Sequence, residues 1–159
     1  MITPEEYFAE HPTACKEAVL FCRVFSTMRA AWLSDRVRVS YMLWALGRHP
    51  EHMASVLQFA AECVKRADGY AAATPEHLIL GAAHNAARCA AHCAGLARVY
   101  FEEGAYGDAA DAAADTAANA VFAAYIARNA SSVPDNADDG ERSIQRDALR
   151  RMFPQMFLT

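Results

Sequence analysis

Apolar residues in the first half of the chain recur every three or four positions, the spacing of one face of a helix. Thr3, Pro4 and Glu6 supply a hydroxyl N-cap, a proline at the first helical position and a glutamate at N3, which together favour a helix start. Thr13, Ser34 and Pro50 repeat such start signals, and glycines at 47 and 69 are stop signals. The pattern predicts four helices, at about residues 3–12, 13–32, 34–47 and 50–69.

Alanine fills close to half of residues 82–130, and alanine is the best helix former. Small residues recur there every fourth position in two runs, Ala82, Ala86, Ala90 and Ala94, and Ala109, Ala113 and Ala117. Gly104 and Gly107 separate the runs, so we expect an antiparallel helical hairpin, residues 75–103 and 108–130, that packs through its alanines.

Local signals refine the second half further. Thr74 starts the first helix of the hairpin, Asp108 caps the second, and glycines at 81 and 95 predict close packing at both points. We expect a loop at residues 132–140 and a last helix at 141–153.

No segment alternates apolar and polar residues in the way that a strand requires. The chain of 159 residues has the length of one domain. We therefore predict an all-α single domain over residues 1–159, a bundle of about seven helices around the alanine-rich hairpin.

The cysteines and the apolar runs bear on the compartment. The chain has five cysteines, an odd number, and the pairs Cys15/Cys22 and Cys89/Cys93 lie at helical spacings that suit disulfides poorly, which indicates reduced thiols. No apolar run is long enough to cross a membrane, and the start of the chain lacks the pattern of a signal peptide. We expect a cytoplasmic protein that does not associate with a membrane.

The net charge of −4 is unevenly distributed. Residues 101–141 hold nine acidic side chains and one arginine, a charge of −8, so the remainder carries +4. Within that segment Asp108, Asp111, Asp115 and Asn119 step by three, four and four residues along one helix face. The face is either simply solvated or a surface for a basic protein, such as a nuclease or a nucleic-acid-binding protein, with apolar anchors at Phe101, Tyr106 and Tyr125.

Four residues of metal-ligand types lie on one predicted helix, namely His84, Cys89, His92 and Cys93. They could bind a metal or a small molecule, but a zinc site normally draws ligands from more than one element, and cysteine also packs well among alanines. No phosphate-binding loop, nucleophile elbow or zinc-protease motif occurs, so we expect no cofactor and no enzymatic activity. Direct nucleic-acid binding is not expected either, because the arginines are scattered and the net charge is negative.

The order of several short motifs resembles that of an uncharacterised alanine-rich helical family, abundant in planctomycetes and related bacteria. It is also similar to helical proteins labelled as candidate immunity proteins. The motifs that carry the resemblance, between about residues 30 and 157, are Ser34-Asp35-Arg36, Arg66-Ala67-Asp68-Gly69, Thr74-Pro75-Glu76, Glu141-Arg142, Gln145, Leu149-Arg150 and Met152-Phe153. The chain departs from that pattern at Tyr41-Met42-Leu43-Trp44, where the family has a cysteine-rich helix. The resemblance implies no catalytic residues; an immunity role would imply binding and blocking a toxin or another effector.

These observations favour a non-enzymatic domain that neutralises or sequesters a protein, either an immunity protein or a phage-type inhibitor of a bacterial defence system. A metal- or small-molecule-binding bundle built on the histidine and cysteine residues is one alternative. A structural or oligomerisation module is another. A homodimer is plausible, because the first helices cannot cover all of the alanine-rich pair.

Overall fold

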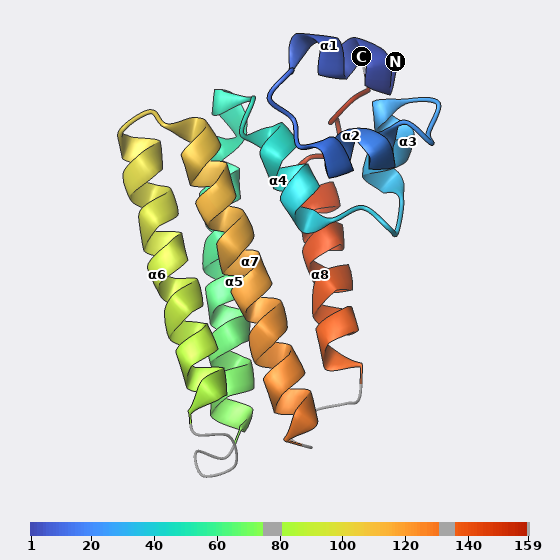
Figure 1. The fold of residues 1–159 in the computed structure, drawn as a ribbon. Helices are drawn as coiled ribbons and strands as arrows, with labels where there is room; N and C mark the ends of the chain where they lie inside the picture. Colours follow the sequence, from blue (N-terminus) through green and yellow to red (C-terminus); the bar gives the residue numbers. More distant parts are fainter. Residues whose placement is uncertain (75–80, 131–135, 159) are drawn as a thin grey trace.

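Every regular element of the computed structural model is a helix within the residues that it describes, 1–74, 81–130 and 136–158 (Figure 1). The elements in chain order are α1 (Pro4–Glu10), α2 (Lys16–Cys22), α3 (Met28–Leu33), α4 (Val39–Leu46), the 3-10 helix η1 (Pro50–His52), α5 (Met53–Ala73), α6 (Ala82–Glu102), α7 (Tyr106–Asn129) and α8 (Ala137–Met152). The predicted all-α single domain is confirmed.

The helices α5, α6 and α7 run side by side and α8 lies against α7, while α1–α4 gather at one end of the bundle (Figure 1). Helix α7 is central, because it packs against α4, α5, α6 and α8. The most extensive contact joins α6 and α7, as the hairpin prediction requires. Alanines fill this contact, including Ala90 and Ala113, neither of which has any exposed surface.

One glycine marks a very close approach of two helices. Gly47 ends α4, and a Cβ atom built on it would lie 2.7 Å from Ala110 Cβ and 3.3 Å from the Tyr106 carbonyl oxygen. The predicted close packing at Gly81 and Gly95 is wrong. Gly81 is the N-cap of α6 with φ +72°, Gly95 is exposed, and a Cβ atom on either meets no described atom within 4 Å.

The helix predicted at residues 13–32 is two helices, α2 and α3. Cys15 rather than Thr13 is the N-cap of α2, and Thr27 caps α3 by accepting a hydrogen bond from the backbone of Ala30. Ser34 ends α3 rather than starting a helix, because α4 begins at Val39. The first helix agrees with its prediction, since Thr3 and Glu6 form a complete capping box.

Three other predicted boundaries move. Helix α5 continues past Gly69 to Ala73, because Ala67 and Ala71 bury against the core on either side of the glycine. Asp108 lies in the first turn of α7 and does not cap it, since α7 begins at Tyr106. Helix α8 includes residues 137–140 of the predicted loop, whereas residues 131–135 and the predicted helix start at residues 75–80 lie outside the described part of the chain.

Residues 153–158 fold back onto the N-terminal helices. Arg29 Nη1 donates a 2.9 Å hydrogen bond to the Met156 carbonyl oxygen, and the Phe157 ring lies 5.2 Å from that of Tyr7 and 5.9 Å from that of Trp32. Phe157 has φ +61°, in the left-handed region that only glycine adopts freely. The buried Tyr7 hydroxyl and Trp32 Nε1 have no hydrogen-bond partner among the described residues.

Candidate protein-binding face

The acidic residues of α7 lie on its exposed side, as their spacing predicts. Asp108, Asp111 and Asp115 are all exposed, and none of the three forms an ion pair with another described residue. Partial burial raises the pKa of Asp111. Repulsion from Asp108 and Asp115 raises this pKa further, and the positive charge of Arg48 opposes the change. Arg48 therefore offsets only part of the repulsion at Asp111, and none of the three carboxylates has an ion-pair partner among the described residues.

Asn119 marks the edge of this face toward α6. Its Nδ2 donates a 2.9 Å hydrogen bond to the Asp115 carbonyl oxygen and lies 4.0 Å from Cys93 Sγ on α6. Because the side chain is half-buried and turned to the neighbouring helix, it offers less to a partner than the three carboxylates do.

The aromatic residues near this face fall into two groups. Phe101 and Tyr106 are half-buried at the α6–α7 turn, with ring centroids 6.0 Å apart, and pack against the main core. Tyr125 is 42% exposed and stacks on Phe122, which is 53% exposed, with ring centroids 6.4 Å apart and an interplanar angle of 11°. The Arg128 guanidinium lies 4.7 Å from the centroid of the Tyr125 ring. Sequence reasoning missed Phe122, although it follows Asp115 by seven residues and so lies on the same face two turns later.

Two acidic residues of the predicted acidic segment are buried rather than available to a partner. Glu141 is fully buried and accepts hydrogen bonds from Arg66 Nε at 2.9 Å, Gln145 Nε2 at 2.7 Å and the Tyr70 hydroxyl at 3.2 Å. Burial, together with Glu141, raises the pKa of Tyr70 to about 12, so its hydroxyl keeps the proton that it donates. Asp138 pairs with Arg128 at 2.7 Å. These ion pairs hold α8 against α5 and α7. Glu141 and Asp138 are therefore not part of the acidic surface that a partner could contact.

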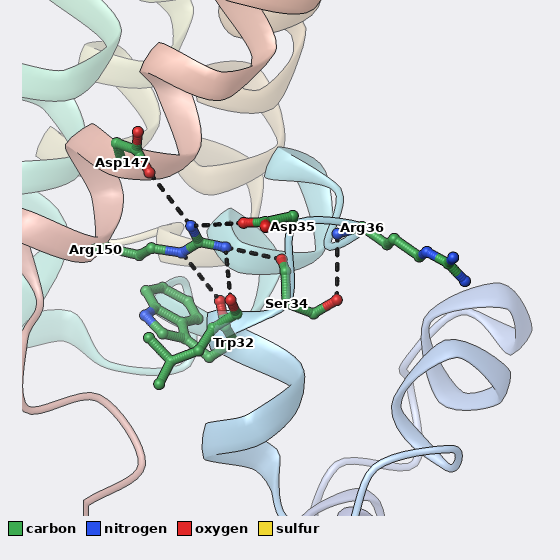
Figure 2. A network of polar contacts seen from close by, with 7 residues as sticks. Trp32, Ser34, Asp35, Arg36, Asp147 and Arg150 are labelled. Carbon is green, nitrogen blue, oxygen red and sulfur yellow. Dashed lines mark hydrogen bonds and ion pairs between the residues drawn. The ribbon is translucent and has the colours of Figure 1, made fainter.

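Two of the motifs behind the family resemblance, Ser34-Asp35-Arg36 and Leu149-Arg150, meet at a second polar network, which Figure 2 shows around Arg150 of α8. Its guanidinium donates to the carbonyl oxygens of Ser34 at 2.8 Å, Leu33 at 3.1 Å and Trp32 at 3.4 Å, at the end of α3. It also contacts the carboxylates of Asp35 at 3.4 Å and Asp147 at 3.3 Å. A cation that satisfies the free carbonyls of a helix end stabilises that end, so Arg150 fixes the α3–α4 connection to α8.

The candidate metal ligands are spread along α6. Cys89 and His92 are exposed, while His84 and Cys93 are half-buried. No group of three or more histidine, cysteine, aspartate or glutamate side chains in the described ranges is arranged to hold a metal ion. Burial raises the pKa of the Cys93 thiol, and the negative charge of Asp115 raises it further. Packing between α6 and α7 accounts for the contacts of Cys93.

Comparison with protein-family models, curated proteins and solved structures finds no match to this chain. The family resemblance of the sequence therefore stays a prediction. None of the helices in the described ranges combines the length and apolarity that crossing a membrane requires.

Proposed function

We propose that this chain is a non-enzymatic binding domain that docks a protein with a basic surface on the exposed face of α7 and thereby blocks that protein. The observation that carries the proposal is the set of three exposed carboxylates, Asp108, Asp111 and Asp115, which lack an ion pair within the described residues. A cationic partner would remove their mutual repulsion on binding, and complementary charge raises the association rate.

The aromatic pair two turns further along α7 supplies the apolar anchor that charge alone does not provide. Phe122 and Tyr125 are stacked and exposed, and aromatic side chains of this kind contribute much of the binding energy at protein interfaces. Seven residues of helix separate Asp115 from Phe122, a distance of about 10 Å, so one partner surface can span both features.

The position of α7 favours a rigid docking face. Four other helices pack against it, and its buried side is built mainly of alanines with no exposed surface. A face held in this way loses little conformational entropy when a partner binds. An immunity protein that blocks a basic toxin, or a phage-type inhibitor of a defence complex, would use such a face.

The experiment compares partners captured by the wild-type chain with those captured by the triple variant Asp108→Asn, Asp111→Asn, Asp115→Asn. For a specific partner, we expect the triple variant to bind more slowly and with a weaker dependence on salt. The matched control is the triple variant Glu5→Gln, Glu17→Gln, Asp68→Asn, which removes the same charge from exposed positions on other helices. This control should bind as the wild type does.

A second pair of variants tests the anchor. Phe122→Ala and Tyr125→Ala should raise the dissociation rate of the same partner and leave its association rate nearly unchanged. If every captured protein binds the wild type and the α7 triple variant equally at all salt concentrations, the acidic face is only solvated and the proposal is wrong.

A further inference from the structure

A groove of about 610 Å³ lies beside the aromatic pair, between α7, α8 and the chain at residues 35–40. Its α7 side consists of small apolar residues followed by the aromatic pair, Ala114, Ala117, Ala118, Val121, Phe122 and Tyr125. Arg142, Gln145 and Arg146 of α8 form the other side. The volume lies within the range of sites that enclose a small molecule.

The charged residues of the groove favour an anion. Arg146 is half-exposed and makes no ion pair or hydrogen bond with another described residue. Arg142 already contacts Asp138 and Asp139, at 3.5 and 2.8 Å. The carboxylate that lines the groove, that of Asp35, is held by Arg150 (Figure 2), so it opposes a bound anion less than a free carboxylate would.

Two further arginines, Arg36 and Arg38, line the groove on the side of residues 35–40. The Arg38 guanidinium lies over the Tyr41 ring, 5.6 Å from its centroid, and the Arg36 side chain extends away from the Arg150 network (Figure 2). On the α8 side of the groove, Arg146 has no ion pair with another described residue, so it is the first cation expected to pair with a bound anion, and Arg142 is the second.

Gln145 lies between these two arginines on α8 and is part of the groove wall. It is only 1% exposed, and its Nε2 donates to the Ala117 carbonyl oxygen at 3.0 Å and to Glu141 Oε1 at 2.7 Å. Both bonds fix the side chain, so Gln145 forms a rigid part of the groove wall.

We infer that the groove binds a small molecule in which a flat aromatic ring system carries an anionic group. The ring packs on the alanines and against Phe122 and Tyr125, and the anionic group pairs with Arg146 and Arg142. The groove shares Phe122 and Tyr125 with the proposed docking face, but the carboxylates of that face are absent from its lining.

Two dyes test the inference on the full chain. The probe is 8-anilinonaphthalene-1-sulfonate, and N-phenyl-1-naphthylamine is the neutral comparison, because it has the same rings without the sulfonate. We expect saturable binding of one sulfonate dye per chain. Arg146→Gln should weaken the sulfonate dye about tenfold, the loss expected for one charge-assisted hydrogen bond, and change the neutral dye by less than about twofold. Arg151→Gln, an exposed charge removed elsewhere on α8, should change neither.

Two blocking variants locate the site. Ala118→Trp fills the groove from an exposed position and should abolish binding of both dyes, with an unchanged circular dichroism spectrum as the check on folding. Ser55→Trp fills a different cavity, of about 500 Å³, lined by His11, His49 and His52, and should leave binding intact. The inference is wrong if no saturable binding occurs, if Arg146→Gln weakens both dyes equally or neither, or if Ser55→Trp rather than Ala118→Trp removes the signal.

Discussion

The contact between α6 and α7 and the region formed by α1–α3 with residues 153–158 are built from side chains of different size. In the first, the contact between α6 and α7 is filled by alanines, so the helices pack closely with little side chain between them. In the second, the side chains that meet are large and aromatic, and they include Tyr7, Trp32 and Phe157. A small-residue contact is sensitive to added atoms, whereas a large-residue contact is sensitive to lost ones.

The two regions also differ in how well they satisfy their polar groups. The buried side-chain atoms without a hydrogen-bond partner in the described chain, the Tyr7 hydroxyl and Trp32 Nε1, both belong to the aromatic region. The positive φ of Phe157 lies there too. Buried polar side chains of the long helices are bonded, as Thr116 is to the Ala112 carbonyl oxygen at 2.9 Å. The comparison indicates that the long helices form the stable frame and that the aromatic region stores the local strain.

The largest expected effect is the loss of an aromatic side chain from the second region. Trp32→Ala should lower the free energy of unfolding by about 3–5 kcal/mol, because the residue is 3% exposed and its removal leaves a large cavity. Chemical denaturation measures the change. A loss below about 1 kcal/mol would show that this region collapses freely and does not depend on its large side chains.

The alanine contact should respond to added volume. Ala90→Leu or Ala113→Leu should lower the free energy of unfolding by about 1–3 kcal/mol, since both positions are fully buried between long helices. Thermal and urea unfolding give the change. Ala54→Leu, at an exposed position on α5, is the control and should stay within about 0.5 kcal/mol of the wild type. Equal stability of both buried variants would contradict close packing of α6 on α7.

Adding a single methyl group at Gly47 tests how closely α4 and α7 pack. Gly47→Ala should destabilise by about 0.5–2 kcal/mol, because the clash with Ala110 and the Tyr106 carbonyl exceeds the usual helical advantage of alanine over glycine. Gly95→Ala should have the opposite sign and stabilise by about 0.5–1 kcal/mol, since its position in α6 is exposed and open. The same sign in urea denaturation for both variants would refute the close approach at Gly47.

The unpartnered hydroxyl of Tyr7 gives a smaller and inverted effect. Tyr7→Phe should leave the free energy of unfolding unchanged or raise it by up to about 1 kcal/mol, because it removes a buried polar group that forms no hydrogen bond with described residues. Urea denaturation measures the difference. A clear loss of stability would mean that the hydroxyl has a partner and that the aromatic region is less strained than described.

The smallest effect belongs to the exposed edge of the long-helix region. The pKa of Asp111 is raised in the folded state above its ordinary value of 3.8, so its stabilising contribution is complete below that value and is lost as the pH rises through the folded pKa. Asp111→Asn should therefore be slightly more stable than the wild type at pH 7, by less than about 0.5 kcal/mol. Melting temperatures at pH 7 and pH 3.5 should show that the difference disappears in acid. If the two proteins differed in melting temperature by the same amount at both pH values, the ionisation of Asp111 would not be the cause of the difference.

The sequence predicts the long helices well because their signals are local and repeated. The alanine period predicts the contact between α6 and α7, and the spacing of Asp108, Asp111 and Asp115 places all three on an exposed face. The short helices are harder to predict. The break at residues 23–27 contains no proline or glycine, and Ser26-Thr27 is its remaining signal. Gly69 stays helical because tertiary burial of Ala67 and Ala71 outweighs the low helix propensity of one glycine.

The groove could not be predicted from local patterns. The α7 side, the α8 side and residues 35–40 are far apart in the chain. Arg150 holds the segment before residue 35 against α8 through hydrogen bonds to the Leu33 and Ser34 carbonyl oxygens. Backbone carbonyls carry no sequence signature. The exposed position of Phe122 was predictable from the helix period, but only the structure shows that it stacks on Tyr125.

The packing of residues 153–158 on the N-terminal helices has a consequence for synthesis on the ribosome. Helices α1–α3 are made long before the Met156 carbonyl that binds Arg29 and the Phe157 ring that contacts Tyr7 and Trp32. The α6–α7 contact joins neighbours in the chain, and contacts that are local in sequence form fast. The hairpin can therefore assemble while the chain is still growing, whereas the contacts of α1–α3 with residues 153–158 can form only after the whole hairpin has been made.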